Sequence, residues 1–235
     1  MAGDGRPRVG MLAPMQCELQ PIVRRLALEG EGSRYDGRTS GGVEVVALLT
    51  NIGMANGAKA ARRMLEWGVD HVIVVGIAGG VDTEALTIGD VIVPEVVIGR
   101  AMERSFRPTF LGDIVPRGTL SCGDDFITDP AALALMATDG VIAVDMETAA
   151  VAEVCEDARV PWSVFRGISD FAGGGLVDDA LFALTNPDGT ADRSALARYL
   201  EENPDRLAIL QRLASDTENA TEAAAAAAIA ACAAL

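Results

Sequence analysis

Along this chain, continuous apolar runs are interleaved with segments in which apolar residues recur at helical spacing. Uninterrupted apolar runs of this length are typical of strands that are buried on both faces of a sheet. The expected strands are residues 8–15, 43–50, 71–75, 91–98, 141–144 and 162–168, with a shorter one within 118–127. The expected helices are residues 17–28, 55–67, 145–158, 194–201, 204–215 and 221–235, and Asp129-Pro130 is typical of a further helix start.

This alternation predicts an α/β fold in which a mostly parallel or mixed central sheet lies between two helical layers. No internal repeat or linker-like change of composition interrupts the chain, so we expect a single three-layer domain over residues 1–235. The segment 29–42 is expected to form a turn or hairpin, and 99–118 a loop or lid. Residues 190–235 are expected to form a helical C-terminal extension.

Composition excludes several classes of protein. Half of the 235 residues are hydrophobic and 23% are charged, which excludes a disordered or fibrous chain. No apolar run approaches the roughly 20 residues of a membrane span. The formal charge of −15, from 19 basic and 34 acidic residues, opposes binding to nucleic acid and to anionic membranes.

Histidine and cysteine usage narrows the chemistry. His71 is the single histidine, and its place at the head of a strand favours a structural role. The four cysteines are scattered without a C-x-x-C motif, which argues against a zinc site and against a disulfide framework. The first residues show no apolar leader, so we expect a cytoplasmic protein whose polar chemistry depends on carboxylates.

Three acidic residues lie at or beside the ends of expected strands. In a parallel sheet, ligands bind at the carboxyl ends of the strands, so these ends should converge. Glu18 and Glu147 lie near helix starts, where capping through the helix dipole is the alternative explanation, whereas Asp170 ends a buried strand. The cluster 76–80 is not a G-x-G-x-x-G fingerprint and instead favours close approach of a flat ligand to bare backbone.

Six short motifs resemble, in order, those of the purine nucleoside phosphorylase and nucleosidase superfamily. Within it, they are most similar to the 5′-methylthioadenosine/S-adenosylhomocysteine nucleosidase branch, and they span residues 8–172. The motifs are MQCE at 15–18, NIGMAN at 51–56, GIAGG at 76–80, GDDFI at 123–127, DME at 145–147 and RGISD at 166–170.

This resemblance implies the hydrolysis of an N-glycosidic bond that releases adenine, with no metal and no organic cofactor. Asp170 would donate a proton to N7 of the purine, and Glu18 would orient and deprotonate the attacking water. Glu147 would hold the ribose hydroxyls. The remaining implied substrate-binding residues are Met15, Ile52, Ala78, Gly79, Phe126, Ile127, Met146 and Ser169.

Two observations favour hydrolysis over phosphorolysis. No arginine stands at the first or third strand end, where a phosphate dianion would need one, and the aspartate at 170 suits a 6-aminopurine. A phosphate-dependent purine nucleoside phosphorylase and a non-catalytic nucleoside-binding protein remain the alternatives. The resemblance also implies a homodimer, and the short segment 99–118 predicts an open 5′ end of the site. Phe171 and Phe182 are candidates for an aromatic lid.

Overall fold

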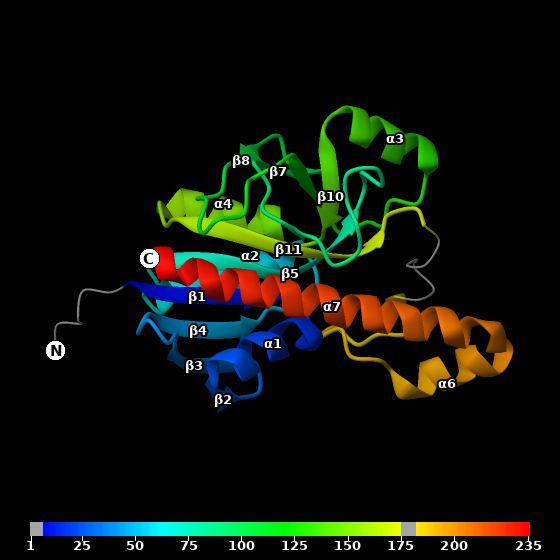
Figure 1. Cartoon of the computed structure of the whole chain (residues 1–235), viewed down its shortest axis with the longest axis horizontal. Coiled ribbons are helices and arrows are strands. Elements are labelled where there is room, and N and C mark those ends of the chain that lie inside the picture. The colour runs from blue at the N-terminus through cyan, green and yellow to red at the C-terminus, as the bar shows by residue number, and fades with distance from the viewer. Residues whose placement is uncertain (1–6, 175–181) are drawn as a thin grey trace.

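The computed structural model describes residues 7–174 and 182–235 of the chain. In this part of the chain, eleven strands form one mixed sheet between two helical layers (Figure 1). The α/β prediction is therefore confirmed. The strands are β1 (Arg8–Ala13), β2 (Glu29–Glu31), β3 (Arg34–Arg38), β4 (Glu44–Leu49), β5 (His71–Gly80), β6 (Val91–Ile92), β7 (Val96–Gly99), β8 (Ser105–Phe106), β9 (Thr119–Cys122), β10 (Val141–Asp145) and β11 (Trp162–Phe171).

The sheet contains two groups of parallel strands, β4-β1-β5-β11 and β10-β9-β7, which are joined by the antiparallel pair β5–β10. The hydrogen-bonded order is β2-β3-β4-β1-β5-β10-β9-β7-β8, while β11 pairs with β5 and with β6. Strands β4, β1, β5 and β11 run parallel to their neighbours in this group, whereas the hairpin β2–β3 extends the sheet in antiparallel fashion. The segment 29–42, predicted as a turn or hairpin, forms this hairpin.

Strand β5 changes partners along its length. Its pairing with β1 ends at Val74, opposite Leu12, and its antiparallel pairing with β10 begins at Gly79, opposite Val144. Between these points the backbone of β5 has no neighbouring strand from β1 or β10. Ile77, in this interval, donates its N–H to a side chain of α1 instead. The opening between β1 and β10 positions the site described below.

Helices cover both faces of the sheet. Apolar residues of α1 and α7 pack against one face, and those of α2 and α4 against the other. Figure 1 shows α7 running along the sheet and continuing beyond it, with α6 next to this projecting part. The helices are α1 (Gln16–Leu26), α2 (Met54–Glu66), α3 (Pro130–Thr138), α4 (Thr148–Ala158), α6 (Arg193–Glu202) and α7 (Leu207–Ala231), with short 3₁₀ helices η1 (Pro204–Arg206) and η2 (Cys232–Ala234).

Small residues bring α7 close to the sheet. Its buried face carries alanines, including Ala220 and Ala224, which leave room for close contact with β11. A Cβ atom added at Gly167 of β11 would lie 2.2 Å from the backbone oxygen of Ala220. Glycine at 167 is therefore required for the observed distance between helix and sheet.

Several predicted boundaries were wrong. Strand β5 continues through the glycine cluster to Gly80, because glycine backbone still completes the pairing with β11. The single strand predicted over 91–98 is two strands, β6 and β7, separated by a short break that contains Pro94. Asp145 ends β10 rather than opening a helix, and α4 begins at Thr148.

The C-terminal segment also differs from the prediction. The two helices expected at 204–215 and 221–235 are one helix, α7, after a single 3₁₀ turn at η1. Residues 207–231 contain neither glycine nor proline, so the polar residues in their middle do not interrupt the helix. The segment 99–118, predicted as a loop or lid, contains the short strand β8. No helix among the described residues is long and apolar enough to cross a membrane.

Candidate active site

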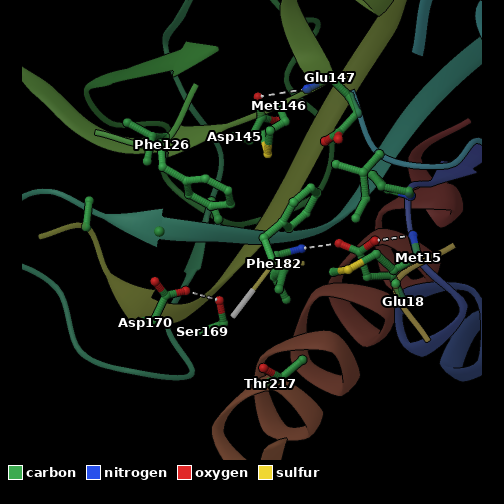
Figure 2. Close-up of a pocket in the computed structure, with 18 of the residues that line it drawn as sticks. Met15, Glu18, Phe126, Asp145, Met146, Glu147, Ser169, Asp170, Phe182 and Thr217 are labelled. Atoms are coloured by element: carbon green, nitrogen blue, oxygen red, sulfur yellow. Dashed lines mark hydrogen bonds between the residues drawn. The ribbon is translucent and has the colours of Figure 1, made fainter. Parts of the chain in front are cut away.

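A cavity of about 310 Å³ lies at the opening between β1 and β10. Figure 2 shows its acidic residues facing it from several sides, with Glu147 across the cavity from Asp170. The structure brings every predicted site residue to this one cavity. They are Met15, Glu18, Ile52, Ala78, Gly79, Phe126, Ile127, Met146, Glu147, Ser169 and Asp170.

Glu18 is held by backbone groups at the start of α1. It is the third residue of the helix, and its Oε2 accepts a hydrogen bond from the N–H of Met15 at 2.6 Å. Its Oε1 accepts the N–H of Ile77 at 2.7 Å, in the interval where β5 pairs with neither β1 nor β10. The capping explanation is thus correct but incomplete, because one carboxylate oxygen reaches across to the sheet. Burial raises the pKa of Glu18 to about 7, against the opposing effect of Arg166.

Glu147 is buried at the N-cap position of α4, but its side chain does not cap that helix. Its Oε1 accepts the N–H of Gly53 at 2.8 Å, and its Oε2 accepts a hydrogen bond from Arg166 at 3.2 Å. Capping was the alternative explanation for this residue, and the geometry replaces it with a link to the turn before α2. Burial raises the pKa of Glu147 to about 8, although Arg166 opposes the shift.

Arg166 lies behind the cavity and joins its acidic residues. Its side chain is fully buried, with Nε and Nη2 donating to Oδ2 of Asp145 at 2.9 and 2.5 Å. Burial by itself would lower the pKa of the guanidinium. The neighbouring carboxyl groups of Asp145, Glu147 and Glu18 outweigh this effect, so the pKa lies above its ordinary value. Arg166 is therefore a permanent cation, and the carboxyl groups of Asp145, Glu147 and Glu18 surround it.

Nη1 of Arg166 is buried without a hydrogen-bond partner among the described residues. It lies 3.7 Å from Oε1 of Glu18, close enough for electrostatic attraction. Gly76 makes this approach sterically feasible, because a Cβ atom there would lie 2.1 Å from Oε1 of Glu18 and 2.6 Å from Nη1. The first glycine of the cluster 76–80 thus accommodates protein side chains rather than a ligand.

Asp170 reaches the cavity through an irregularity in β11. The pairing with β5 passes from Ile168 opposite Ala78 to Asp170 opposite Gly79, so Ser169 is an extra residue in the strand. Such a bulge changes the direction of side chains that regular alternation would send to opposite faces. The Ser169 hydroxyl donates to Oδ1 of Asp170 at 2.6 Å. Burial raises the pKa of Asp170, and the hydrogen bond from Ser169 opposes this shift.

An aromatic pair forms another wall of the cavity. The rings of Phe126 and Phe182 meet edge to face with centroids 5.2 Å apart. Phe182 thus lines the cavity, as expected of a lid candidate, whereas Phe171 packs against the hydrophobic core and is not among the lining residues. Arg100 holds the loop that carries Phe126, since its Nη2 donates to the carbonyls of Gly123 and Asp125, each at 2.7 Å.

The sequence matches the family model described as "Phosphorylase superfamily" over residues 1–114 and 110–235. The chain belongs to the phosphorylase superfamily.

Relatives within the superfamily have related names. The chain is 33% identical to the 5′-methylthioadenosine/S-adenosylhomocysteine nucleosidase of Anoxybacillus flavithermus over 201 residues, which cover 70% of this chain and 86% of that protein. The fold of this superfamily member is similar to a futalosine hydrolase of Helicobacter pylori, with a TM-score of 0.72, 18% identity and coverage of 97% and 98% of the two chains. It is also similar to an adenine complex of the Colwellia psychrerythraea nucleosidase, with a TM-score of 0.71, 21% identity and coverage of 97% and 95%.

Sequence reasoning missed several residues of this superfamily member's site. Arg166 was part of a recognised motif, yet no role was assigned to it, because the sequence does not show which acidic residues surround it. Thr217 and Leu213 line the cavity from α7, some fifty residues beyond the last motif. A signal existed for Arg166 alone: an arginine inside an otherwise apolar strand requires acidic partners.

His71 lies outside the cavity. His71 is buried at the start of β5, where its Nε2 lies 2.8 Å from the Ser163 hydroxyl, which in turn donates to the Thr109 carbonyl. This agrees with a structural role at the strand end. Over residues 7–174 and 182–235, no group of three histidine, cysteine or acidic side chains is arranged to hold a metal ion.

Proposed function

We propose that the protein hydrolyses the N-glycosidic bond of an adenine nucleoside and releases adenine. The observation that carries this proposal is the arrangement of Glu18, Glu147 and Asp170 around one cavity, each with a different set of partners. Relatives with the name of 5′-methylthioadenosine/S-adenosylhomocysteine nucleosidase support the same class of reaction.

In the proposed reaction, Asp170 protonates N7 of the purine as the bond between C1′ and N9 breaks. The bonding electron pair leaves with the base, and positive charge develops on the ribose. A raised pKa keeps a larger fraction of Asp170 protonated, which suits a proton donor. The purine would stack on Phe126, which borders the cavity together with Asp170.

Glu18 would act on the water that attacks C1′. Its pKa of about 7 is near the value at which a general base works best at neutral pH. The water oxygen bonds to C1′ and its proton passes to Glu18, so adenine and a free sugar are the products. Glu147 would accept hydrogen bonds from the ribose hydroxyls, and Met146 would pack against the sugar.

Cation placement favours hydrolysis over phosphorolysis. Among the described residues that line the cavity, the only basic one is Arg100, whose guanidinium already donates to loop carbonyls. Arg166 lies behind the acidic residues and contacts Asp145 and Glu147. A phosphate dianion would therefore meet mainly acidic side chains, with Arg100 as the only basic residue among the described lining residues, which disfavours its binding.

The proposal is tested by incubating the purified protein with 5′-methylthioadenosine, adenosine and S-adenosylhomocysteine, with and without phosphate. We expect free adenine and a reducing sugar at the same rate in both conditions. Formation of a sugar 1-phosphate that requires phosphate would establish the phosphorylase alternative. Tight nucleoside binding without either product would instead establish the binding-protein alternative.

We further propose that the protein acts as a cytoplasmic homodimer, as the family resemblance implies. Light scattering after size-exclusion chromatography tests the assembly, with a mass of twice 24.4 kDa as the expected result. A monomer that cleaves nucleosides at full rate would contradict the dimer but not the reaction.

A further inference from the structure

A second cavity, of about 620 Å³, adjoins the first. It lies between α1, the projecting half of α7 and the segment 184–196. Its walls are mostly apolar, with leucines and alanines from α7 and from the segment 184–196. They include Leu184, Ala191, Leu196, Leu210 and Ala214.

The two cavities are adjacent. Five residues line both of them: Cys17, Thr185, Gly189, Leu213 and Thr217. Figure 2 shows Thr217 on α7, across the first cavity from Met146 and Glu147. These shared residues form the border of the two cavities, which places the second cavity next to any group that the first one binds.

If the proposed function holds, the border between the two cavities lies near the 5′ end of the bound nucleoside. In the proposed binding mode the purine lies at Phe126 and Asp170 and the ribose at Glu147, and we place the 5′ carbon on the side of Met15, where the first cavity borders the second. The segment 184–196 approaches Met15 here, since a Cβ atom at Gly189 would lie 2.4 Å from Cγ of Met15. Cys17, which lines both cavities, follows Met15 by two residues.

We propose that the second cavity binds a long, uncharged apolar group attached to the 5′ carbon of the nucleoside. This inference rests on the proposed function and specifies its substrate class. The second cavity, at about 620 Å³, has twice the volume of the first at about 310 Å³, so a 5′-methylthio group would leave it empty. An aliphatic chain fits its leucine-rich walls, because burial of apolar surface drives binding there.

The charges at the rim oppose a zwitterionic amino-acid tail. Arg24, the basic residue among the described lining residues, is already engaged in an ion pair with Glu222. Glu222 also pairs with Arg25, while Glu218 adds negative charge at the same cavity and would repel a free carboxylate. The cavity therefore favours an apolar substituent over the charged tail of S-adenosylhomocysteine.

The test compares 5′-S-decylthioadenosine, 5′-methylthioadenosine and S-adenosylhomocysteine as substrates. We expect kcat/KM for the decyl compound to be at least about tenfold above that for the methyl compound, through a lower KM. The variant Ala214→Trp, which places an indole in the second cavity, should lower this ratio at least about tenfold. Ala208→Trp is the matched control, since Ala208 is an exposed alanine of α7 that lines neither cavity.

Calorimetry separates failure of this inference from failure of the proposed function. If no compound releases adenine, tighter binding of the decyl than the methyl compound, lost in Ala214→Trp and retained in Ala208→Trp, would still support the cavity assignment. Equal effects of both variants would indicate that the decyl group adsorbs nonspecifically to the protein, and would overturn the assignment. A preference for S-adenosylhomocysteine over the decyl compound would overturn it as well.

Discussion

The carboxylate of Glu18 and the guanidinium of Arg166 lie 3.7 Å apart in the protein interior, one from α1 and the other from β11. Asp145 and Glu147 contact the same guanidinium. The cavity thus has a fixed cation behind it and several acidic groups around it, and burial raises the pKa of Glu18 and Glu147 to about 7 and about 8. Removal or displacement of any member should alter the protonation of the others.

Gly76→Ala tests the contact between Glu18 and Arg166. The added methyl would lie 2.1 Å from Oε1 of Glu18, so the carboxylate must move away from Ile77 and Arg166. We expect a loss of adenine release of roughly 100-fold, because small displacements of a catalytic group are costly. Gly41→Ala is the control, since its nearest atom is the Thr39 hydroxyl at 3.6 Å. Comparable losses in both variants would refute the steric argument.

Asp170→Asn tests the proposed proton donor. The amide keeps the shape of the carboxyl group but cannot protonate N7, so turnover should fall roughly 100- to 10,000-fold while nucleoside binding is retained. Ser169→Ala should behave differently. It removes a hydrogen bond that holds the pKa of Asp170 down, so the alkaline limb of the pH–rate profile should shift to higher pH. Asp170→Asn activity within tenfold of the parent would exclude Asp170 as the donor.

Glu18→Gln and Glu147→Gln should separate the roles of two buried glutamates. In the proposed reaction Glu18 acts on water, so its replacement should lower turnover with little change in nucleoside affinity, whereas Glu147→Gln should also weaken binding. In the parent protein, kcat/KM should fall below a pH of about 7, as the Glu18 carboxylate becomes protonated. Equal changes of calorimetric affinity in both variants would show that these roles are wrongly assigned.

His71 should make the protein less stable in mild acid. Burial lowers its pKa from 6.5 to about 4, so between these values the unfolded chain binds a proton that the folded chain does not. This contribution therefore leaves stability unaffected above pH 6.5 and destabilises the fold progressively toward pH 4, by roughly 3 kcal/mol in total.

His71→Gln removes the titration and can still donate to the Ser163 hydroxyl. Urea unfolding at pH 7 and pH 4.5 should show a smaller loss of stability in the variant than in the parent protein. Acidic residues titrate in both proteins and cancel in this comparison. An identical loss would mean that His71 titrates equally in the folded and unfolded chains.

Local sequence signals determined the type and approximate position of most elements of this protein. Strands β1, β4 and β10 and helices α1 and α2 follow from apolar runs and helical spacing, which depend on neighbours within a few residues. Glu18 and Asp170 could be grouped from the sequence, because the carboxyl ends of the parallel strands β1 and β11 meet at one edge, whereas Glu147 follows β10, which runs antiparallel to β5.

Only the tertiary structure decided what depends on contacts between distant segments. Three features depend on residues that are far apart in the chain. They are the change of strand partner along β5, the position of Arg166 behind the acidic residues of the cavity, and the contribution of α7 to the cavity wall. The boundaries of the glycine cluster and of α7 were mispredicted for the same reason. Glycine permits both strand and turn, and a polar interruption permits both one helix and two, so packing against β11 and the rest of the sheet selects between them.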